Sequence, residues 1–284
     1  MMLLAYFLSA MLLLIPAHDS DLIYETDAHP TQGTLVQNSC VLTAYTDGDV
    51  SSGSMQRLVT EFDAQGRLVQ MSGEDGSFAR ISWEGELPAA KVLEFEGEEI
   101  MRVNFQREGS VLVAEVQEEG IEMLRMEMSL DAQGRLTEVR EMEYEDGGWV
   151  TIASETYVWE GANVVRSQTV MDTGGRGPQV WMNLYTYDEN PNAFGGQGYG
   201  IIMLANGAIG QGFAGYGSAN NLIAHRQRDL EAPVDIRSES AALAAAGSSW
   251  EDTDFEITYG DHHNILRLID PQSGMMRDFE WRCE

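Results

Sequence analysis

The sequence predicts an all-β protein, an antiparallel meander of about a dozen strands that curls into an open or closed barrel, with a β-sandwich as the alternative. Two observations lead to this prediction. Short turn units recur along nearly the whole chain, and between them polar and apolar residues alternate with the period of two that half-buried strands show. A long meander with one apolar face has to curl over that face, or pack one part on another, to keep it from water.

The clearest turn unit occurs twice, letter for letter. Asp-Ala-Gln-Gly-Arg-Leu occupies positions 63–68 and again 131–136. Looser copies consist of an aromatic residue or Leu, a short run of turn residues, and an aliphatic or aromatic residue. The full set lies at 62–68, 83–87, 105–111, 130–136, 159–164, 187–194 and 259–265. Gly and Asn supply the positive φ that tight hairpins need. Each interval between the first six units fits two strands and two short connections.

The alternation assigns side chains to faces of the predicted strands. Met101, Val103 and Phe105 share one face of their strand. In the same way Met126 and Met128 fall beside leucines at 124 and 130, so these methionines belong to the core rather than to a copper site.

A segment at 195–250 breaks the pattern. It is rich in Gly, contains the apolar run 201–204 and ends in the small-residue stretch 241–246. We expect a Gly-rich insert, part helix and part loop, which caps one end of the sheet. It is either a lid or plug over a barrel mouth or a cover that binds nothing. Within it, Asn220 and Asn221 are expected to bond turn backbone.

The N-terminus indicates export. Residues 1–17 carry no charged side chain and are interpreted as a signal peptide, 18–39 as a flexible segment, and 40–284 as a single repeat-built β domain. The apolar stretch is shorter than the ~20 residues that span a bilayer, so no membrane span is predicted. The expected location is the periplasm, the cell surface or the medium.

The charge restricts the partners. The chain has 46 Asp and Glu against 17 Lys and Arg, a net charge of −29, which disfavours nucleic acid and anionic lipid. Cationic partners or divalent cations fit better. The acidic pairs Asp47-Gly48-Asp49 and Glu145-Asp146 make calcium a candidate weak stabiliser. The oligomeric state is not predicted.

The two cysteines, Cys40 and Cys283, lie near opposite ends of the mature chain. Two interpretations stand side by side. In an oxidising compartment they form a disulfide that joins the first and last strands, and otherwise they are two unpaired, partly buried thiols.

No catalytic, cofactor-binding or metal-binding residue is assigned. The glycine pattern at 210–215, with Asp235 beyond it, resembles a dinucleotide fingerprint but has no βαβ unit around it. Asp261, His262 and His263 fall in a predicted hairpin turn; a solvated turn is the preferred interpretation, and a transition-metal or acid–base site is the alternative. We find no Gly-x-Ser-x-Gly elbow. No cofactor and no enzymatic activity are expected.

The turn units resemble the YD-type repeats of bacterial secreted proteins. More narrowly, Tyr-Asp-Glu-Asn-Pro-Asn-Ala-Phe at 187–194, followed by Gly-Ser-Ala-Asn-Asn-Leu at 217–222, resembles a bacterial extracytoplasmic domain of unknown function. That resemblance implies a porin-like, curled antiparallel fold and an exported protein, with no established activity. This chain departs from the family pattern in lacking the Lys of the Asn-Pro element, in the two residues between Pro191 and Phe194, and in lacking a lipid-attachment Cys.

The resulting hypothesis is an exported, non-enzymatic binding or structural scaffold. Two alternatives remain. One is a carrier that holds a small apolar ligand inside the barrel. The other is a hydrolase that acts on an extracytoplasmic polymer through paired carboxylates at one end of the barrel.

Overall fold

The computed structural model describes residues 36–37, 40–49, 54–118, 120–145, 147–173, 177–194, 197–205, 209, 213–246 and 250–283. The predicted signal peptide and nearly all of segment 18–39 lie outside these residues; only the two-residue strand β1 (Val36–Gln37) belongs to that segment. Among the described residues, no helix has the length and apolar character needed to cross a membrane.

All strands belong to one antiparallel sheet. Besides β1, its members are β2 (Cys40–Asp49), β3 (Ser54–Phe62), β4 (Leu68–Gly73), β5 (Ser77–Glu84), β6 (Leu87–Phe95), β7 (Glu98–Glu108), β8 (Val111–Glu118), β9 (Ile121–Leu130), β10 (Leu136–Glu145), β11 (Gly148–Glu160), β12 (Asn163–Met171), β13 (Gln179–Pro191), β14 (Asn220–Leu230), β15 (Glu251–Asp254), β16 (Glu256–Tyr259), β17 (Ile265–Ile269) and β18 (Met275–Cys283). The helices are α2 (Gln197–Leu204), α3 (Phe213–Gly217) and α4 (Glu239–Ala246).

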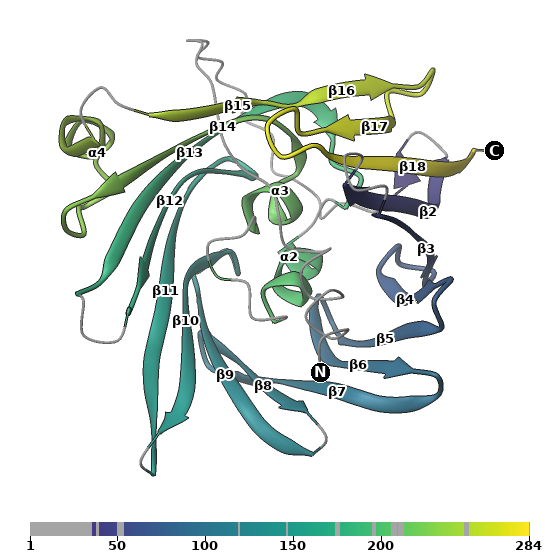
Figure 1. Ribbon diagram of the computed structural model, residues 1–284, viewed down its shortest axis with the longest axis horizontal. Helices are drawn as coiled ribbons and strands as arrows, with labels where there is room; N and C mark the ends of the chain where they lie inside the picture. The colour runs from purple at the N-terminus through teal and green to yellow at the C-terminus, as the bar shows by residue number, and fades with distance from the viewer. Residues whose placement is uncertain are drawn as a thin grey trace.

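The sheet curls into a nearly closed barrel (Figure 1), which confirms the predicted fold class over the sandwich alternative. Each strand from β2 to β15 pairs with its sequence neighbour, and the last strand, β18, pairs with β2. One seam is not sealed by a ladder. β15 pairs with β14 and β16 pairs with β17, so the two short strands lie end to end across Phe255 and carry the chain over the seam.

Six of the seven turn units connect strands that are paired in the sheet. Each interval between the first six units holds two strands, as the spacing predicts. The total exceeds a dozen because β2, β3 and β14–β18 complete the ring. The unit at 187–194 is different: β13 runs through most of it, and the chain then enters the barrel instead of turning back.

The repeated hexapeptide builds the same turn twice. In the first copy one carboxylate oxygen of Asp63 accepts the backbone N–H groups of Gln65 and Arg67, each at 2.9 Å, and the other accepts Arg67 Nε at 2.8 Å. Gly66 takes the required positive φ of 76°. Arg67 also lies over the ring of Trp83, whose Nε1 donates to the carbonyl that opens β4.

The second copy repeats each of these contacts. Asp131 accepts the same two backbone N–H groups and Arg135 Nε, Gly134 has a φ of 79°, and Arg135 lies over Trp159. Trp159 Nε1 donates to the Leu136 carbonyl at 2.6 Å. Each copy of the sequence repeat therefore forms the same structural module, in which the turn contacts a tryptophan from the end of a later strand.

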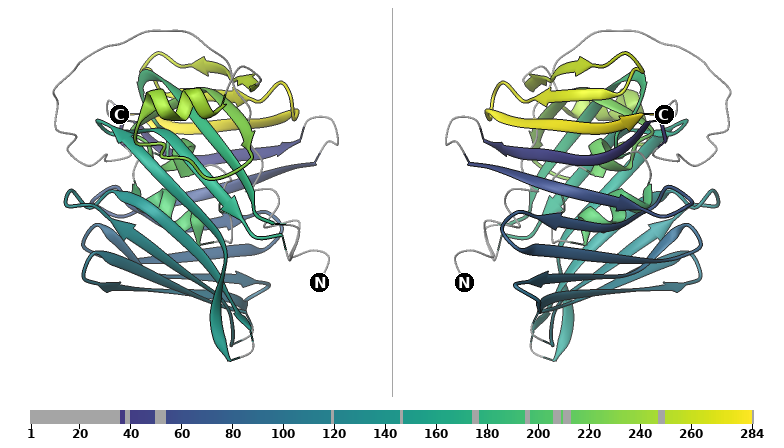
Figure 2. Two further views of the ribbon diagram at one scale, coloured as in Figure 1. Left: turned by 90° about the vertical axis from the view of Figure 1, so that its left-hand side faces the viewer. Right: turned by 90° about the vertical axis from the view of Figure 1, so that its right-hand side faces the viewer.

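Segment 195–250 is not a single insert. It contains the wall strand β14, which pairs with β13 and β15. Its helices take two places: α2 and α3 lie within the ring of strands, whereas α4 lies outside it (Figure 1). On the outer face, Met182, Ile236 and Ala242 form a small apolar cluster separate from the main core. The side views in Figure 2 show the strands inclined around the enclosed helices.

Candidate functional site

The interior of the barrel is occupied by a plug, which we define as residues 192–217 as far as the structure describes them. Its apolar run Ile201, Ile202, Met203 and Leu204 is buried in the same core as the inward side chains of the wall. Glycines allow close packing here. A Cβ at Gly198 would lie 2.6 Å from the Trp83 ring of β5. Glycine at this position thus lets an aromatic ring of the wall lie directly against the backbone of the plug.

A buried ion pair links the wall to the plug. Arg277 on β18 donates to both carboxylate oxygens of Asp47 on β2, at 3.2 and 3.0 Å. The guanidinium also lies 5.6 Å from the ring centres of Phe194 and Tyr216 of the plug, and 5.8 Å from that of Tyr45. Burial alone would lower the pKa of Arg277, but the Asp47 carboxylate outweighs burial and the pKa is raised well above its ordinary value. The charge is stabilised from both sides.

The two motifs that carry the family resemblance meet at the entrance of the plug. Asn192 donates to the backbone carbonyls of Gly215 and Ser218, and Ser218 Oγ donates to the Tyr187 hydroxyl at 3.0 Å. Asn220 Nδ2 donates to the Asn190 carbonyl at 3.2 Å. The Asn-Pro element and the Asn-Asn-Leu element therefore tie the plug to β13 and β14, as expected for Asn220.

The second asparagine of that pair has the same role, because Asn221 Nδ2 also donates to the Asn190 carbonyl, at 3.4 Å. Asn221 donates its backbone N–H to Asp188 at 3.2 Å, and the Tyr259 hydroxyl of β16 donates to the same carboxylate. This network connects β13 and β14 with the strand beyond the seam. Residues of both motifs therefore make contacts that hold the plug and the neighbouring strands together.

The inner face of the wall has two chemically different halves. On β3–β10 the buried residues that face the plug are mainly aliphatic: Leu58, Met71, Ala79, Ile81, Leu93, Met101, Val103, Leu112, Ala114, Val116, Met126, Met128, Leu130, Leu136 and Val139. We call this the apolar half. Lys91 is its one buried cation among the described residues, and desolvation lowers its pKa to about 8.

On β11–β15 the inner face is polar. Tyr157 packs against Phe213 of the plug, with ring centres 4.8 Å apart and the ring planes tilted by 45°, so its face of β11 points inward. The strand register then places a set of buried polar residues on the same surface. We call this the polar half: Glu155, Ser167, Thr169, Asn183, His225 and Thr253, each at most 2% exposed.

Hydrogen bonds run across the polar half from strand to strand. Asn183 Nδ2 donates to Ser167 Oγ at 2.9 Å, and Ser167 Oγ shares a hydrogen bond of 2.9 Å with the Tyr185 hydroxyl. Asn183 Oδ1 lies 3.1 Å from His225 Nε2. Because an amide oxygen only accepts, Nε2 carries the proton and Nδ1 is the lone-pair nitrogen. At the β11 end, the Tyr157 hydroxyl donates to Glu155 at 3.0 Å.

His225 is neutral in this setting. Desolvation lowers its pKa from 6.5 to about 3, and the ring stacks on Tyr185 at 5.0 Å between centres. Within the described residues, His225 Nδ1 and the hydroxyls of Thr169 and Thr253 have no hydrogen-bond partner. These three atoms are the positions in the polar half where a water molecule or a polar group would be accepted.

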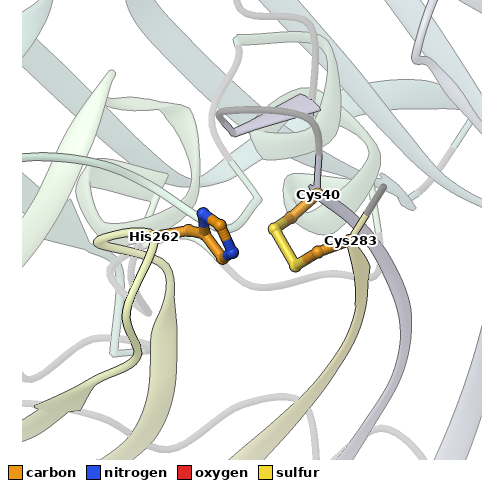
Figure 3. Close-up of side chains that lie close together, drawn as sticks. All are labelled: Cys40, His262 and Cys283. Atoms are coloured by element: carbon orange, nitrogen blue, oxygen red, sulfur yellow. A yellow bond between two sulfur atoms is a disulfide. The ribbon is translucent and has the colours of Figure 1, made fainter.

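The structure places Cys40 and Cys283 in a disulfide that joins β2 to β18. The sequence left open a disulfide or two unpaired thiols, and the structure has the disulfide. The two residues are directly opposite each other in the β2–β18 ladder. Figure 3 shows the imidazole of His262 beside the two sulfurs; the ligand atoms of the three residues lie within 4.8 Å of one another. The His262 position in the β16–β17 turn, with an exposed side chain, matches the predicted solvated turn.

The structure also places the other residues that the sequence analysis considered as calcium, nucleotide or copper ligands. Asp47 does not lie in an acidic loop but within β2, where both its carboxylate oxygens bond Arg277. Asp146 and residues 210–212, the first half of the glycine pattern at 210–215, lie outside the described residues. Phe213 begins the plug helix α3. Met126 and Met128 are fully buried, which confirms their assignment to the core.

Sequence reasoning missed the polar half. Ala153, Tyr157 and Trp159 share one face of β11 by the period of two, and Glu155 belongs to that same face. A carboxylate among aromatic residues of a predicted core face was the available signal.

No protein-family model and no curated protein matches this chain. Among solved structures it is similar to a porin-like protein from Bacteroides vulgatus ATCC 8482, with a TM-score of 0.50 and 12% identity, covering 85% of this chain and 98% of that one. This likeness shows the fold, a porin-like barrel.

Two further solved structures are less alike. The TcdB2-TccC3-Cdc42 structure aligns with a TM-score of 0.28 and 9% identity, covering 86% of this chain and 14% of that chain. A DUF3836 family protein from Parabacteroides distasonis ATCC 8503 gives 0.16 and 19% identity, covering 35% of this chain and 73% of that one. Both TM-scores are too low to indicate a shared fold.

Proposed function

We propose that this protein is an exported, non-enzymatic scaffold, a plugged barrel that meets water on its outer face and binds partners through that face and its turns. The observation that carries the proposal is the plug itself. α2 and α3 occupy the space that a channel or an apolar-ligand carrier would need, and Arg277, Asn192 and Ser218 hold them to the wall.

The outer face of the wall supports an aqueous setting. Outward side chains form ion pairs within a strand or across strands: Arg57–Glu280, Arg80–Glu94, Arg102–Glu99, Arg125–Glu115, Arg140–Glu138 and Arg267–Asp278. A wall that faces lipid carries an apolar band, and a charged group at its centre costs about 2–4 kcal/mol. Ion pairs spread over six places around the wall favour contact with water.

The carrier and hydrolase hypotheses receive less support. An apolar ligand would compete with Ile201, Ile202 and Leu204 for the apolar half. For hydrolysis, the inward carboxylate Glu155 is buried and accepts a hydrogen bond from Tyr157, whereas paired catalytic carboxylates flank a cleft that substrate enters.

Export rests on the N-terminal sequence and is consistent with the disulfide, since such bonds persist in oxidising compartments. The repeated turn module and the plug-binding role of both family motifs support kinship with the extracytoplasmic family that the sequence resembles.

Native mass spectrometry tests the scaffold proposal. The mature protein, purified from its own envelope fraction without reductant, should show the mass of the chain alone. A co-purified small molecule lost on denaturation would replace the proposal with the carrier hypothesis. A companion variant, I201A/I202A, removes apolar volume from α2 and should acquire binding of an apolar fluorescent probe that the unaltered protein lacks.

Two further assays address membrane association and catalysis. Vesicle flotation with neutral and anionic lipids should leave the protein in the aqueous fraction, and recovery with the vesicles would contradict the aqueous wall. Turnover of polysaccharides or esters by the purified protein would contradict the non-enzymatic proposal.

A further inference from the structure

The disulfide and His262 come from three elements that the barrel closure brings together. Cys40 is the first residue of β2 and Cys283 the last of β18, and His262 lies in the turn between β16 and β17. β17 pairs with β18 and β18 with β2, so the three residues lie at one edge of this part of the wall. The imidazole and Cys283 are exposed, whereas Cys40 is buried.

The turn that carries His262 is held independently of the sulfurs. Gly260 N–H donates to the Asn264 carbonyl at 2.8 Å, and His263 N–H donates back to the Gly260 carbonyl at 3.1 Å. Trp281 of β18 donates its Nε1 to the Ile265 carbonyl at 2.7 Å and ties the end of the turn to the neighbouring strand. His262 therefore keeps its place beside the two cysteines whether or not they are bonded.

We propose that, once the disulfide is reduced, Cys40, Cys283 and His262 form a zinc site. In a tetrahedral site with Zn–S near 2.3 Å and Zn–N near 2.0 Å, ligand atoms stand roughly 3.5–3.8 Å apart. The present atoms all lie within 4.8 Å of one another, so rotation of the freed cysteine side chains reaches that arrangement. Thiolate and imidazole ligands suit zinc and disfavour calcium or magnesium.

The chemistry requires a reductant, which we specify as a phosphine. It takes oxygen from water to become a phosphine oxide; the S–S bond accepts its two electrons, and the two water protons form the two thiols. Zinc then displaces one proton from each thiol. Three protein ligands leave a fourth position for water. The disulfide and the zinc ion would thus be alternative clamps between the first and last long strands, selected by redox conditions.

Cobalt titration of the full chain tests the site, because Co²⁺ bound by thiolates shows charge-transfer and tetrahedral d–d bands that zinc abolishes. The phosphine-reduced protein should bind one equivalent of Co²⁺, and the oxidised protein should show no thiolate band. H262Q should weaken binding by at least about tenfold. The matched control is H263Q, in the same turn, which should leave the affinity within about threefold.

Two results would overturn the proposal: equal affinity of H262Q and the unaltered protein, or a thiolate band in the oxidised protein. If reduction unfolds the chain, the test uses zinc-dependent refolding followed by the β signal in circular dichroism. Zinc should restore that signal in the unaltered protein and in H263Q but not in H262Q, since only a ligand that binds the folded state stabilises it. Equal recovery in H262Q, or no recovery in any of the three, would also refute the site.

Discussion

The two halves of the inner wall solve the same packing problem with different chemistry. On the apolar half, Val103 and Met126 meet the plug with aliphatic surface. On the polar half, Asn183 and His225 form a hydrogen-bonded lattice that runs across the strands. The strands of both halves show the same alternation, so the halves differ in which residue types occupy the inward positions. Apolar positions tolerate replacement by another apolar side chain of similar volume, whereas buried polar groups require particular hydrogen-bond partners.

The ion pair at the plug should give the largest effect. Asp47→Asn leaves the Arg277 charge buried without its counter-charge, and we expect a loss of about 3–5 kcal/mol in the free energy of unfolding, measured with urea. The control is Glu280→Gln, which breaks the exposed Arg57–Glu280 pair and should cost no more than about 1 kcal/mol. Equal losses would mean that the buried pair does not anchor the plug.

Acid should weaken the polar half through His225. Its pKa is about 3 in the fold and 6.5 when unfolded, so between these values the unfolded chain binds more protons and stability falls as pH falls. The contribution is fully present above pH 6.5 and decreases by about 3 kcal/mol by pH 4. His225→Gln should flatten this part of the stability curve relative to the unaltered protein, and the exposed His263→Gln should not. Parallel curves for all three proteins would contradict a neutral buried His225.

Replacing an inward side chain with leucine in each half should distinguish the two halves directly. Asn183→Leu removes the partners of His225 Nε2 and Ser167, and we expect a loss of about 2–4 kcal/mol by urea unfolding. Met126→Leu, a near-isosteric change in the apolar half, should cost less than about 1.5 kcal/mol. The comparison fails if the leucine is tolerated equally at both positions.

The tryptophans of the two turn modules should contribute equally, although Trp83 lies on β5 in the apolar half and Trp159 on β11 in the polar half. Trp83→Phe and Trp159→Phe each remove one hydrogen bond to a strand-opening carbonyl, and each should cost about 1 kcal/mol. We expect the two losses, from thermal or urea unfolding, to agree within about 0.5 kcal/mol. A larger gap would show that the lattice of the polar half affects Trp159.

The sequence by itself determined the wall of this protein. The Asp63 and Asp131 turns form from contacts within six residues, and the period of two assigns Met126 and Met128 to one face, so local signals suffice for hairpins and their order. The same period groups residues on a face without saying which face is interior. The period places Glu155 on the face of Tyr157, but the burial of Glu155 and Asn183 inside the barrel depends on the neighbouring strands.

Only the tertiary structure decided what closing the barrel brings together. It pairs β18 with β2, which bonds Cys40 to Cys283 across 243 positions and sets His262 beside them. It also separates segment 195–250 into a plug, a wall strand and an outer helix. Contacts of this range depend on the register and curvature of the whole sheet, because each strand is positioned by its neighbours and not by its own residues.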